Sequence, residues 1–148
     1  MTSDGTWNYT WEHGRQLKSA SNGSSSVSYK YNADGMRLSK TVGSTTTKYY
    51  YVGDKLTDMV QGNDKLHFTY DASGPAGINY NGTQYYYLKN AQGDVLGIVN
   101  SSGSLVVSYT YDAWGNVLST TGSMATTLGA LNPLRYRGYV YDNETGLY

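Results

Sequence analysis

Residues Tyr109–Leu118, which read YTYDAWGNVL, decide the fold of this chain. Two tyrosines alternate with one small polar residue, which is the period of an extended strand with both rings on one face. Asp112 then opens a turn that Gly115 closes, because glycine accepts the positive φ that a hairpin turn needs. Residues 116–118 begin a return strand. The stretch therefore predicts one β-hairpin.

The same unit recurs along the whole chain, for example as YKYNADGMRL in residues 29–38 and as YVYDNETGL in residues 139–147. The turn glycines of the copies are Gly14, Gly35, Gly53, Gly74, Gly93, Gly115 and Gly146. They are separated by 21, 18, 21, 19, 22 and 31 residues. A period near twenty with one insertion is typical of a hairpin array.

Second turns lie between the copies, such as Asn22-Gly23 and Asn81-Gly82, and they join one hairpin to the next. The strands between turns are rich in Tyr, Val and Thr. The pattern predicts an all-β antiparallel meander of about 13 strands. Open twisted sheets rarely exceed about 10 strands without curling, so we expect a curled or spiral sheet.

The composition limits the partners and the chemistry. Eleven Lys and Arg balance eleven Asp and Glu, with no basic run, which argues against nucleic acid and anionic membranes as partners. There is no cysteine, which excludes disulfides and thiolate metal sites. No apolar run approaches the ~20 residues of a membrane span. Seventeen tyrosines predict a sheet lined by rings that keep a polar hydroxyl.

The chain is predicted to have three regions: hairpin repeats in residues 1–118, an irregular insertion in residues 119–132, and a different C-terminal run in residues 133–148. The insertion accounts for the 31-residue spacing. We expect residues 124–131 to form a loop packed on the sheet, with a single helical turn ended by Pro133 as the alternative.

The repeat Tyr-x-Tyr-Asp-x-x-Gly-x-x-Leu resembles the YD repeats of the rearrangement-hotspot (RHS) and teneurin family, and residues 132–148, NPLRYRGYVYDNETGLY, resemble the start of the RHS-associated core motif. The resemblance implies a hollow β-shell that encloses a C-terminal toxin or effector in bacterial members. In animal relatives it implies part of an adhesion receptor. The family motif continues beyond the Gly-Leu-Tyr run to a self-cleavage site, so the chain is interpreted as an arc of a larger shell, ending inside the core motif.

We predict structural roles in the repeat and in the core motif for a set of tyrosines, turn residues and arginines. They are Tyr31, Gly35, Tyr51, Gly53, Tyr70, Asp71, Gly74, Tyr87, Gly93, Tyr111, Asp112, Gly115, Arg135, Tyr136, Arg137, Gly138, Tyr141, Asp142 and Gly146. For Arg135 and Arg137 we expect cation–π or salt-bridge contacts beside the tyrosines.

The turn aspartates have two readings, catalytic acids or metal ligands on one side and caps of the turn backbone on the other. Asn32 stands where other copies have aspartate, which favours the cap, because turn geometry accepts either residue. His13 and His67 lie in different repeats, without a second ligand at metal spacing. No nucleophile elbow, phosphate loop or zinc motif occurs. The sequence therefore predicts no enzyme, no catalytic or metal site, and no cofactor.

The leading hypothesis is a structural, non-catalytic segment of a secreted or cell-surface RHS protein, part of a shell that encloses an effector or presents an adhesive surface. Its expected partners are further repeats and a C-terminal effector. The alternative is a cell-wall or glycan-binding module, in which rings such as those of residues 85–87 stack on sugars. The open sheet edges also predict self-association into dimers or filaments.

Overall fold

The structure is a computed structural model that describes residues 2–148; Met1, the first residue of the predicted repeat region, lies outside the described residues. The chain divides into two compact units, Met1–Lys65 and Leu66–Tyr148. Within residues 2–148 there are twelve strands, whose order follows the sequence. The predicted all-β antiparallel meander is confirmed, with twelve strands in place of about 13. The curling of the sheet stays a prediction.

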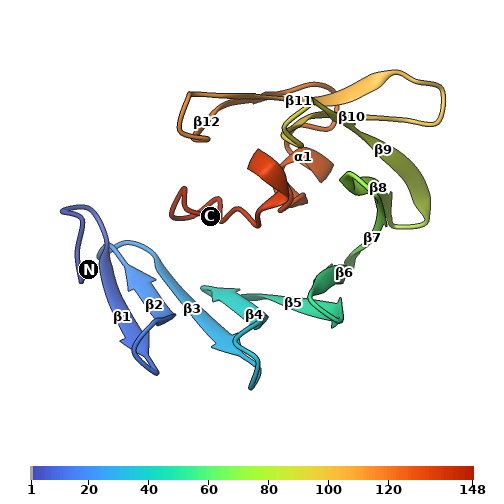
Figure 1. Ribbon diagram of the computed structural model, residues 1–148. Coiled ribbons are helices and arrows are strands. Elements are labelled where there is room, and N and C mark those ends of the chain that lie inside the picture. The colour runs from blue at the N-terminus through green and yellow to red at the C-terminus, as the bar shows by residue number, and fades with distance from the viewer. Residues whose placement is uncertain (1) are drawn as a thin grey trace. The chain divides into compact units, whose positions relative to one another are not determined.

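The first unit consists of three hairpins (Figure 1). Their strands are β1 (Asn8–Glu12), β2 (Gln16–Ser21), β3 (Ser26–Tyr31), β4 (Arg37–Val42), β5 (Thr45–Val52) and β6 (Lys55–Gln61). Each strand pairs antiparallel with the next. The outer edge of β1 is partly covered, because the N–H of Tyr9 donates to the Thr2 carbonyl and Ser3 bridges Asn8. Self-association through sheet edges stays a prediction.

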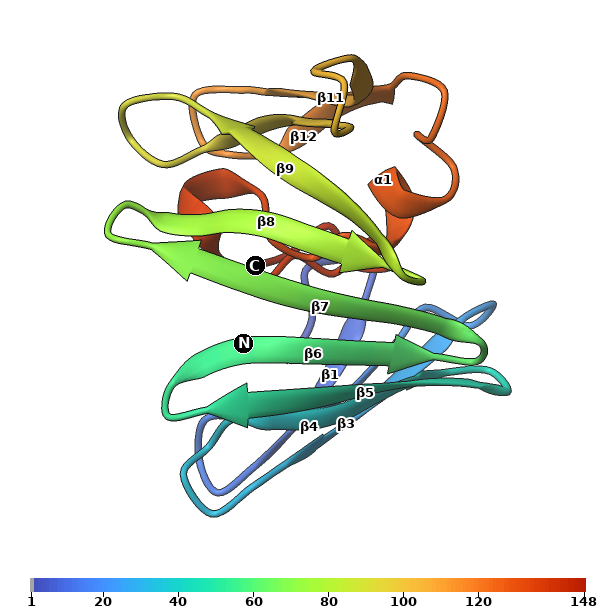
Figure 2. The same ribbon diagram turned by 90° about the vertical axis from the view of Figure 1, so that its right-hand side faces the viewer.

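The second unit continues the same pattern with most of β7 (Asp64–Asp71) and with five further strands. These are β8 (Gly74–Tyr80), β9 (Thr83–Lys89), β10 (Val95–Val99), β11 (Leu105–Tyr111) and β12 (Val117–Thr121). Figure 2 shows β7, β8 and β9 side by side. The remaining pairs, β9 with β10, β10 with β11, and β11 with β12, are also antiparallel.

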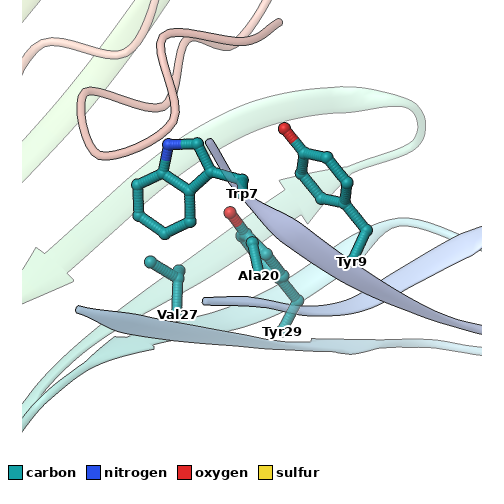
Figure 3. Close-up of a cluster of buried hydrophobic side chains, with 5 residues drawn as sticks. All are labelled: Trp7, Tyr9, Ala20, Val27 and Tyr29. Atoms are coloured by element: carbon teal, nitrogen blue, oxygen red, sulfur yellow. The ribbon is translucent and has the colours of Figure 1, made fainter. Parts of the chain in front are cut away.

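Alternation along the odd-numbered strands buries one aromatic ring per hairpin. In β3, for example, Val27 and Tyr29 are buried while Ser26, Ser28 and Lys30 are exposed. The equivalent buried rings, here called the ring row, are Tyr9, Tyr29 and Tyr49 in the first unit, and Phe68, Tyr87 and Tyr109 in the second. Figure 3 shows Tyr9 and Tyr29 packed with Trp7, Ala20 and Val27. One aromatic residue of each repeat thus contributes to the core, and in β9 it is Tyr87, the last ring of the Tyr85–Tyr87 triplet.

Every odd-to-even hairpin carries a β-bulge at the same place, just after the turn. The residues without a cross-strand partner there are Lys18, Leu38, Thr57, Ala76, Leu96 and Leu118. Leu38 and Leu118, the last residues of their motifs, are 43% and 66% exposed because the bulge turns them away from the core. The regular bulge is a feature of the repeat that the hydrophobic pattern did not predict.

The C-terminal segment departs from the hairpin pattern. After β12, residues form one helical turn, α1 (Leu128–Leu131), and a short 3₁₀ turn, η1 (Tyr136–Gly138). The predicted irregular insertion, residues 119–132, therefore begins as the last three residues of β12 and ends in the helical turn. The last copy of the motif, residues 139–147, forms only isolated bridges, Leu134 with Val140 and Asp142 with Leu147, in place of the predicted hairpin. It folds back on its own segment and not on a neighbouring strand.

Candidate functional site: a polar centre beneath the C-terminal segment

The motif's Asx residues cap turns. In four turns, opened by Asn32, Asn90, Asn100 and Asp112, the side-chain Oδ1 accepts the N–H groups two and four residues on, and the carbonyl accepts the N–H of the turn glycine. Asparagine and aspartate make the same bonds, so the turn needs the oxygen and not the charge. The pKa of Asp112 is lowered, mainly because its carboxylate accepts a hydrogen bond from the side-chain amide of Asn116.

The other two predicted turn aspartates differ from this pattern. Asp71 accepts the N–H and hydroxyl of Ser73 and lies 3.7 Å from Lys89 Nζ. The pKa of Asp71 is lowered, mainly by the hydrogen bond from the Ser73 hydroxyl. Asp142 is buried, and its carbonyl accepts the N–H of Gly146 at 2.8 Å. The Asp71 side chain therefore caps a local turn, whereas the turn at Asp142 is closed by backbone groups.

The second tyrosine of the motif joins one hairpin to the preceding one. Tyr31 donates its hydroxyl to the Leu17 carbonyl at 2.7 Å, and Tyr111 donates to the Val95 carbonyl at 2.6 Å. Tyr51 and Tyr70 occupy the same half-buried position in β5 and β7. A ring that packs between hairpins while its hydroxyl binds backbone satisfies both parts of the side chain.

Asn132 is the centre of the most deeply buried polar cluster of the second unit, and it is fully buried. Its Oδ1 accepts the hydroxyl of Tyr87 at 2.6 Å. Its Nδ2 donates to the Leu134 carbonyl at 2.8 Å and to the Tyr109 hydroxyl at 3.3 Å. Tyr109 in turn donates to the Gly129 carbonyl at 2.7 Å. One amide therefore links two rings of the ring row to the C-terminal segment.

Arg135 places a positive charge beside Asn132, with only 2% of the residue exposed. Its Nε donates to the Asn132 carbonyl and its Nη2 to the Gly129 carbonyl, both at 3.1 Å. The guanidinium carbon lies 4.9 Å from the centroid of the Tyr109 ring and 4.6 Å from that of Tyr141. Carbonyl oxygens and two aromatic faces thus compensate for the lost hydration of the cation.

The rim of this polar centre consists of the remaining core-motif residues. The backbone N–H of Arg137 donates to Asp94 Oδ1 at 3.0 Å, while the Arg137 side chain stays exposed beside the Tyr136 ring. The Tyr148 hydroxyl donates to the Gly115 carbonyl at 2.8 Å. The Tyr148 ring lies 6.0 Å from Tyr136 and 4.9 Å from Tyr141. These contacts bring both ends of the core motif against the sheet.

Burial controls the chemistry of the tyrosines at this centre. It raises the pKa of Tyr87 well above its ordinary value and also raises the pKa of Tyr109, although the nearby Arg135 charge opposes the second shift. Both hydroxyls therefore stay protonated at neutral pH and serve as hydrogen-bond donors.

The structure brings some predicted residues together and leaves others in separate turns. Tyr87, Arg135 and Tyr141 converge on the polar centre, and Tyr111 and Tyr136 contact each other beside it. The predicted glycines Gly35, Gly53, Gly74, Gly93, Gly115 and Gly146 all have positive φ in turns. Tyr31 and Tyr51 lie in the first unit and are not part of the polar centre.

Sequence reasoning missed Asn132, Tyr109, Asp94 and Tyr148 as members of this site. The 31-residue spacing was the available signal, because an insertion that interrupts a repeat needs anchors to pack on the sheet. His13 lies in a turn with positive φ and His67 is exposed in β7. Residues 2–148 contain no group of three or more His, Cys, Asp or Glu placed to hold a metal. No helix among these residues is long and apolar enough to cross a bilayer.

Residues 90–123, which include β10, β11 and β12, match the family model of the RHS repeat. This stretch of the chain is similar to the RHS repeat. Solved structures agree with the fold: the crystal structure of TcdB2-TccC3-Cdc42 superimposes with a TM-score of 0.70 at 16% identity, over 97% of this chain and 8% of that chain. The Tc holotoxin pore of Photorhabdus luminescens gives a TM-score of 0.61, with the same identity and coverage. The resemblance to the RHS/YD-repeat family is confirmed.

Curated relatives of this chain come from Bacillus. The tRNA3(Ser)-specific nuclease WapA of Bacillus spizizenii is 40% identical, and the tRNA nuclease WapA of Bacillus subtilis is 39% identical. Each alignment covers 99% of this chain and 6% of the relative. The chain thus spans only about 6% of the length of the curated relatives it matches.

These relatives contradict one sequence prediction. At about 40% identity over nearly the whole chain they are named tRNA nucleases, so the prediction of no enzyme is wrong. That prediction came from the absence of catalytic motifs in 148 residues. A motif search of this stretch samples only a small part of proteins as long as the relatives.

Proposed function

We propose that this chain is a wall segment of an RHS-type shell in a longer, secreted or cell-surface protein that acts as a tRNA nuclease. The regular ring row carries the structural part of the proposal. Each hairpin buries one aromatic residue and has a capped or tight turn. It contacts mainly the hairpins next to it along the chain. A wall can grow by adding such units, because each new hairpin brings its own core residue and its own turn.

The nuclease part rests on the names of the Bacillus relatives, and tRNA is the substrate that those names specify. This proposed substrate differs from the sequence prediction of no nucleic-acid partner, which considered only the charge pattern of these residues. Further repeats and an enclosed C-terminal effector are the partners that the proposal requires.

The burial of the rings supports a wall over the glycan-binding alternative. A sugar platform needs open ring faces, whereas the ring-row residues Tyr29, Tyr49 and Tyr109 are 2–4% exposed. In the triplet of residues 85–87, Tyr87 is 8% exposed and Tyr86 is 47% exposed. A single open ring gives a sugar little surface on which to stack.

The proposal is tested in the full-length protein by limited proteolysis. The part that follows the repeats is expected to resist protease in the native protein and to be digested faster after Tyr109→Ala, which removes a ring-row residue. The matched control is Tyr50→Ala, a tyrosine that is half exposed on β5. Mass spectrometry of the fragments at each time point shows when the part that follows the repeats is digested. tRNA cleavage is measured at the same time points.

Equal digestion rates in the native protein and in the Tyr109→Ala variant would argue against enclosure. Equal acceleration by Tyr109→Ala and Tyr50→Ala would show that the ring row has no special role in the wall.

A further inference from the structure

Residues 127–148, here called the docking segment, contact the rest of the second unit through a set of separate hydrogen bonds. Figure 1 shows this segment in orange-red and red on one side of the last strands. The bonds join Asn132 to Tyr87, Gly129 to Tyr109, Arg135 to Val95, Arg137 to Asp94, and Tyr148 to Gly115. The partners belong to β9, β10, β11 and the turns beside them, so residues spread along the segment contact several neighbouring strands and turns.

The docking segment is held differently from a strand. Its isolated bridges, Leu134 with Val140 and Asp142 with Leu147, join parts of the segment to each other. Further bonds inside it, such as Asn143 Nδ2 to the Ala130 carbonyl at 2.6 Å, fix its own shape. The segment therefore folds into a small structure that contacts the sheet through both side-chain and backbone groups.

Arg135 gives this recognition its geometry. Its Nε and Nη2 donate to the Asn132 and Gly129 carbonyls, which hold the docking segment in its own shape, while the flat guanidinium lies against the Tyr109 ring of the sheet. Lysine keeps the charge but has a compact ammonium group, which cannot make both bonds from one plane or stack in the same way. A buried cation that loses these partners is strongly unfavourable.

We propose that the face formed by β9–β12 is a binding surface whose ligand is the docking segment, and that Asn132 and Arg135 are the residues by which the segment is recognised. The segment is held without a covalent bond and remains bound after the chain is cut. This inference goes beyond the proposed function and depends only on contacts within the second unit.

The test begins with the intact folded chain. A site for a specific protease is inserted between Thr126 and Thr127, which are both exposed, and the folded protein is cut there. We expect residues 127–148 to co-elute with the remainder in size-exclusion chromatography. After Arg135→Lys, the affinity of the cut segment should fall about tenfold or more, because the guanidinium no longer lies against the Tyr109 ring and no longer fixes the Asn132 and Gly129 backbone that meets the sheet.

Arg137→Lys is the matched control, since that side chain is exposed and the contact with Asp94 uses the backbone N–H. Its cut segment should stay bound as in the native chain. A synthetic peptide of the native residues 127–148 should then bind to the cut Arg135→Lys protein, which shows that the sheet is intact.

Three results would overturn the inference. The first is separation of the native segment as soon as the chain is cut. The second is equal retention of the cut segments that carry Arg135→Lys and Arg137→Lys. The third is failure of the native peptide to bind to the cut Arg135→Lys protein. The enclosure experiment measures protease protection of the part that follows the repeats, whereas this test measures retention of residues 127–148 with Tyr109 unchanged. A failure of one can therefore be told from a failure of the other.

Discussion

The two units are built from the same hairpin, but they cover their ring rows in different ways. In the first unit the sheet supplies its own cover: Arg37 of β4 lies 4.4 Å from the centroid of Tyr29 and 5.9 Å from that of Tyr49. In the second unit Arg135, outside the sheet, lies over Tyr109. The repeat therefore specifies the hairpin, whereas the group that covers the rings differs from one unit to the other.

Charged side chains are also distributed unequally between the two units. Residues 1–65 contain eight of the eleven Lys and Arg and six of the eleven Asp and Glu. The second unit keeps only Lys89, Arg135 and Arg137 as cationic side chains. Arg135 is therefore a rare cation in an acidic unit, and it is the buried one. Its loss should have a larger effect than the loss of an arginine in the first unit.

The sharpest test of this difference is a pair of arginine truncations. Arg135→Ala should lower the free energy of unfolding by about 2–4 kcal/mol, because it removes hydrogen bonds from a charged donor to the buried Asn132 and Gly129 carbonyls and leaves a gap beside the Tyr109 ring. Arg37→Ala should cost about 1 kcal/mol, in the range of a partly exposed cation–π contact. Urea unfolding of both variants measures the two values. Equal losses would remove the distinction between the two kinds of cover.

A smaller effect is expected from two glycines at the same motif position. Gly35 and Gly115 both have positive φ, 82° and 90°, so alanine costs about 1 kcal/mol at either site. At Gly115 an added Cβ would also lie 2.5 Å from Tyr136 Cδ1, which adds about 1–3 kcal/mol of overpacking. At Gly35 the nearest atom, Gln16 Nε2, is 3.4 Å away. Thermal unfolding of the two alanine variants should therefore show the larger loss at Gly115; the opposite order would mean that Tyr136 does not press on this turn.

The smallest effect concerns alkaline pH. The pKa of Tyr9 rises to about 12 mainly through its hydrogen bond to the Asp4 carboxylate, and the pKa of Tyr148 rises to about 12 mainly through burial. Because both folded values exceed the unfolded value of about 10, the stabilisation is complete below pH ~10 and is lost as pH rises toward 12. Asp4→Asn should return the pKa of Tyr9 toward 10 and leave that of Tyr148 unchanged.

Site-resolved NMR titration of tyrosine ring carbons measures both values in one sample. A shift of both tyrosines on Asp4→Asn would contradict the separate causes, and a shift of neither would exclude the hydrogen bond as the main cause at Tyr9.

Most of the fold could be predicted because its signals are local. Alternation in strands such as Ser26–Tyr31 and glycine turns at a period near twenty need only neighbouring residues to be read. The polar centre could not be predicted in the same way. Tyr87 and Asn132 are 45 residues apart, and nothing in their local sequence indicates that one hydroxyl meets the other's amide. The exposure of Leu118 could not be predicted either, because a β-bulge changes the face of the sheet on which simple alternation would place its side chain.

The amino-acid sequence by itself determined a meander of capped hairpins with one buried ring in each, because period-two alternation and positive-φ glycines act over a few residues. Only the tertiary structure decided what covers those rings. A buried amide or guanidinium is stable only where distant chain segments supply its partners, and those partners meet only after the sheet has formed.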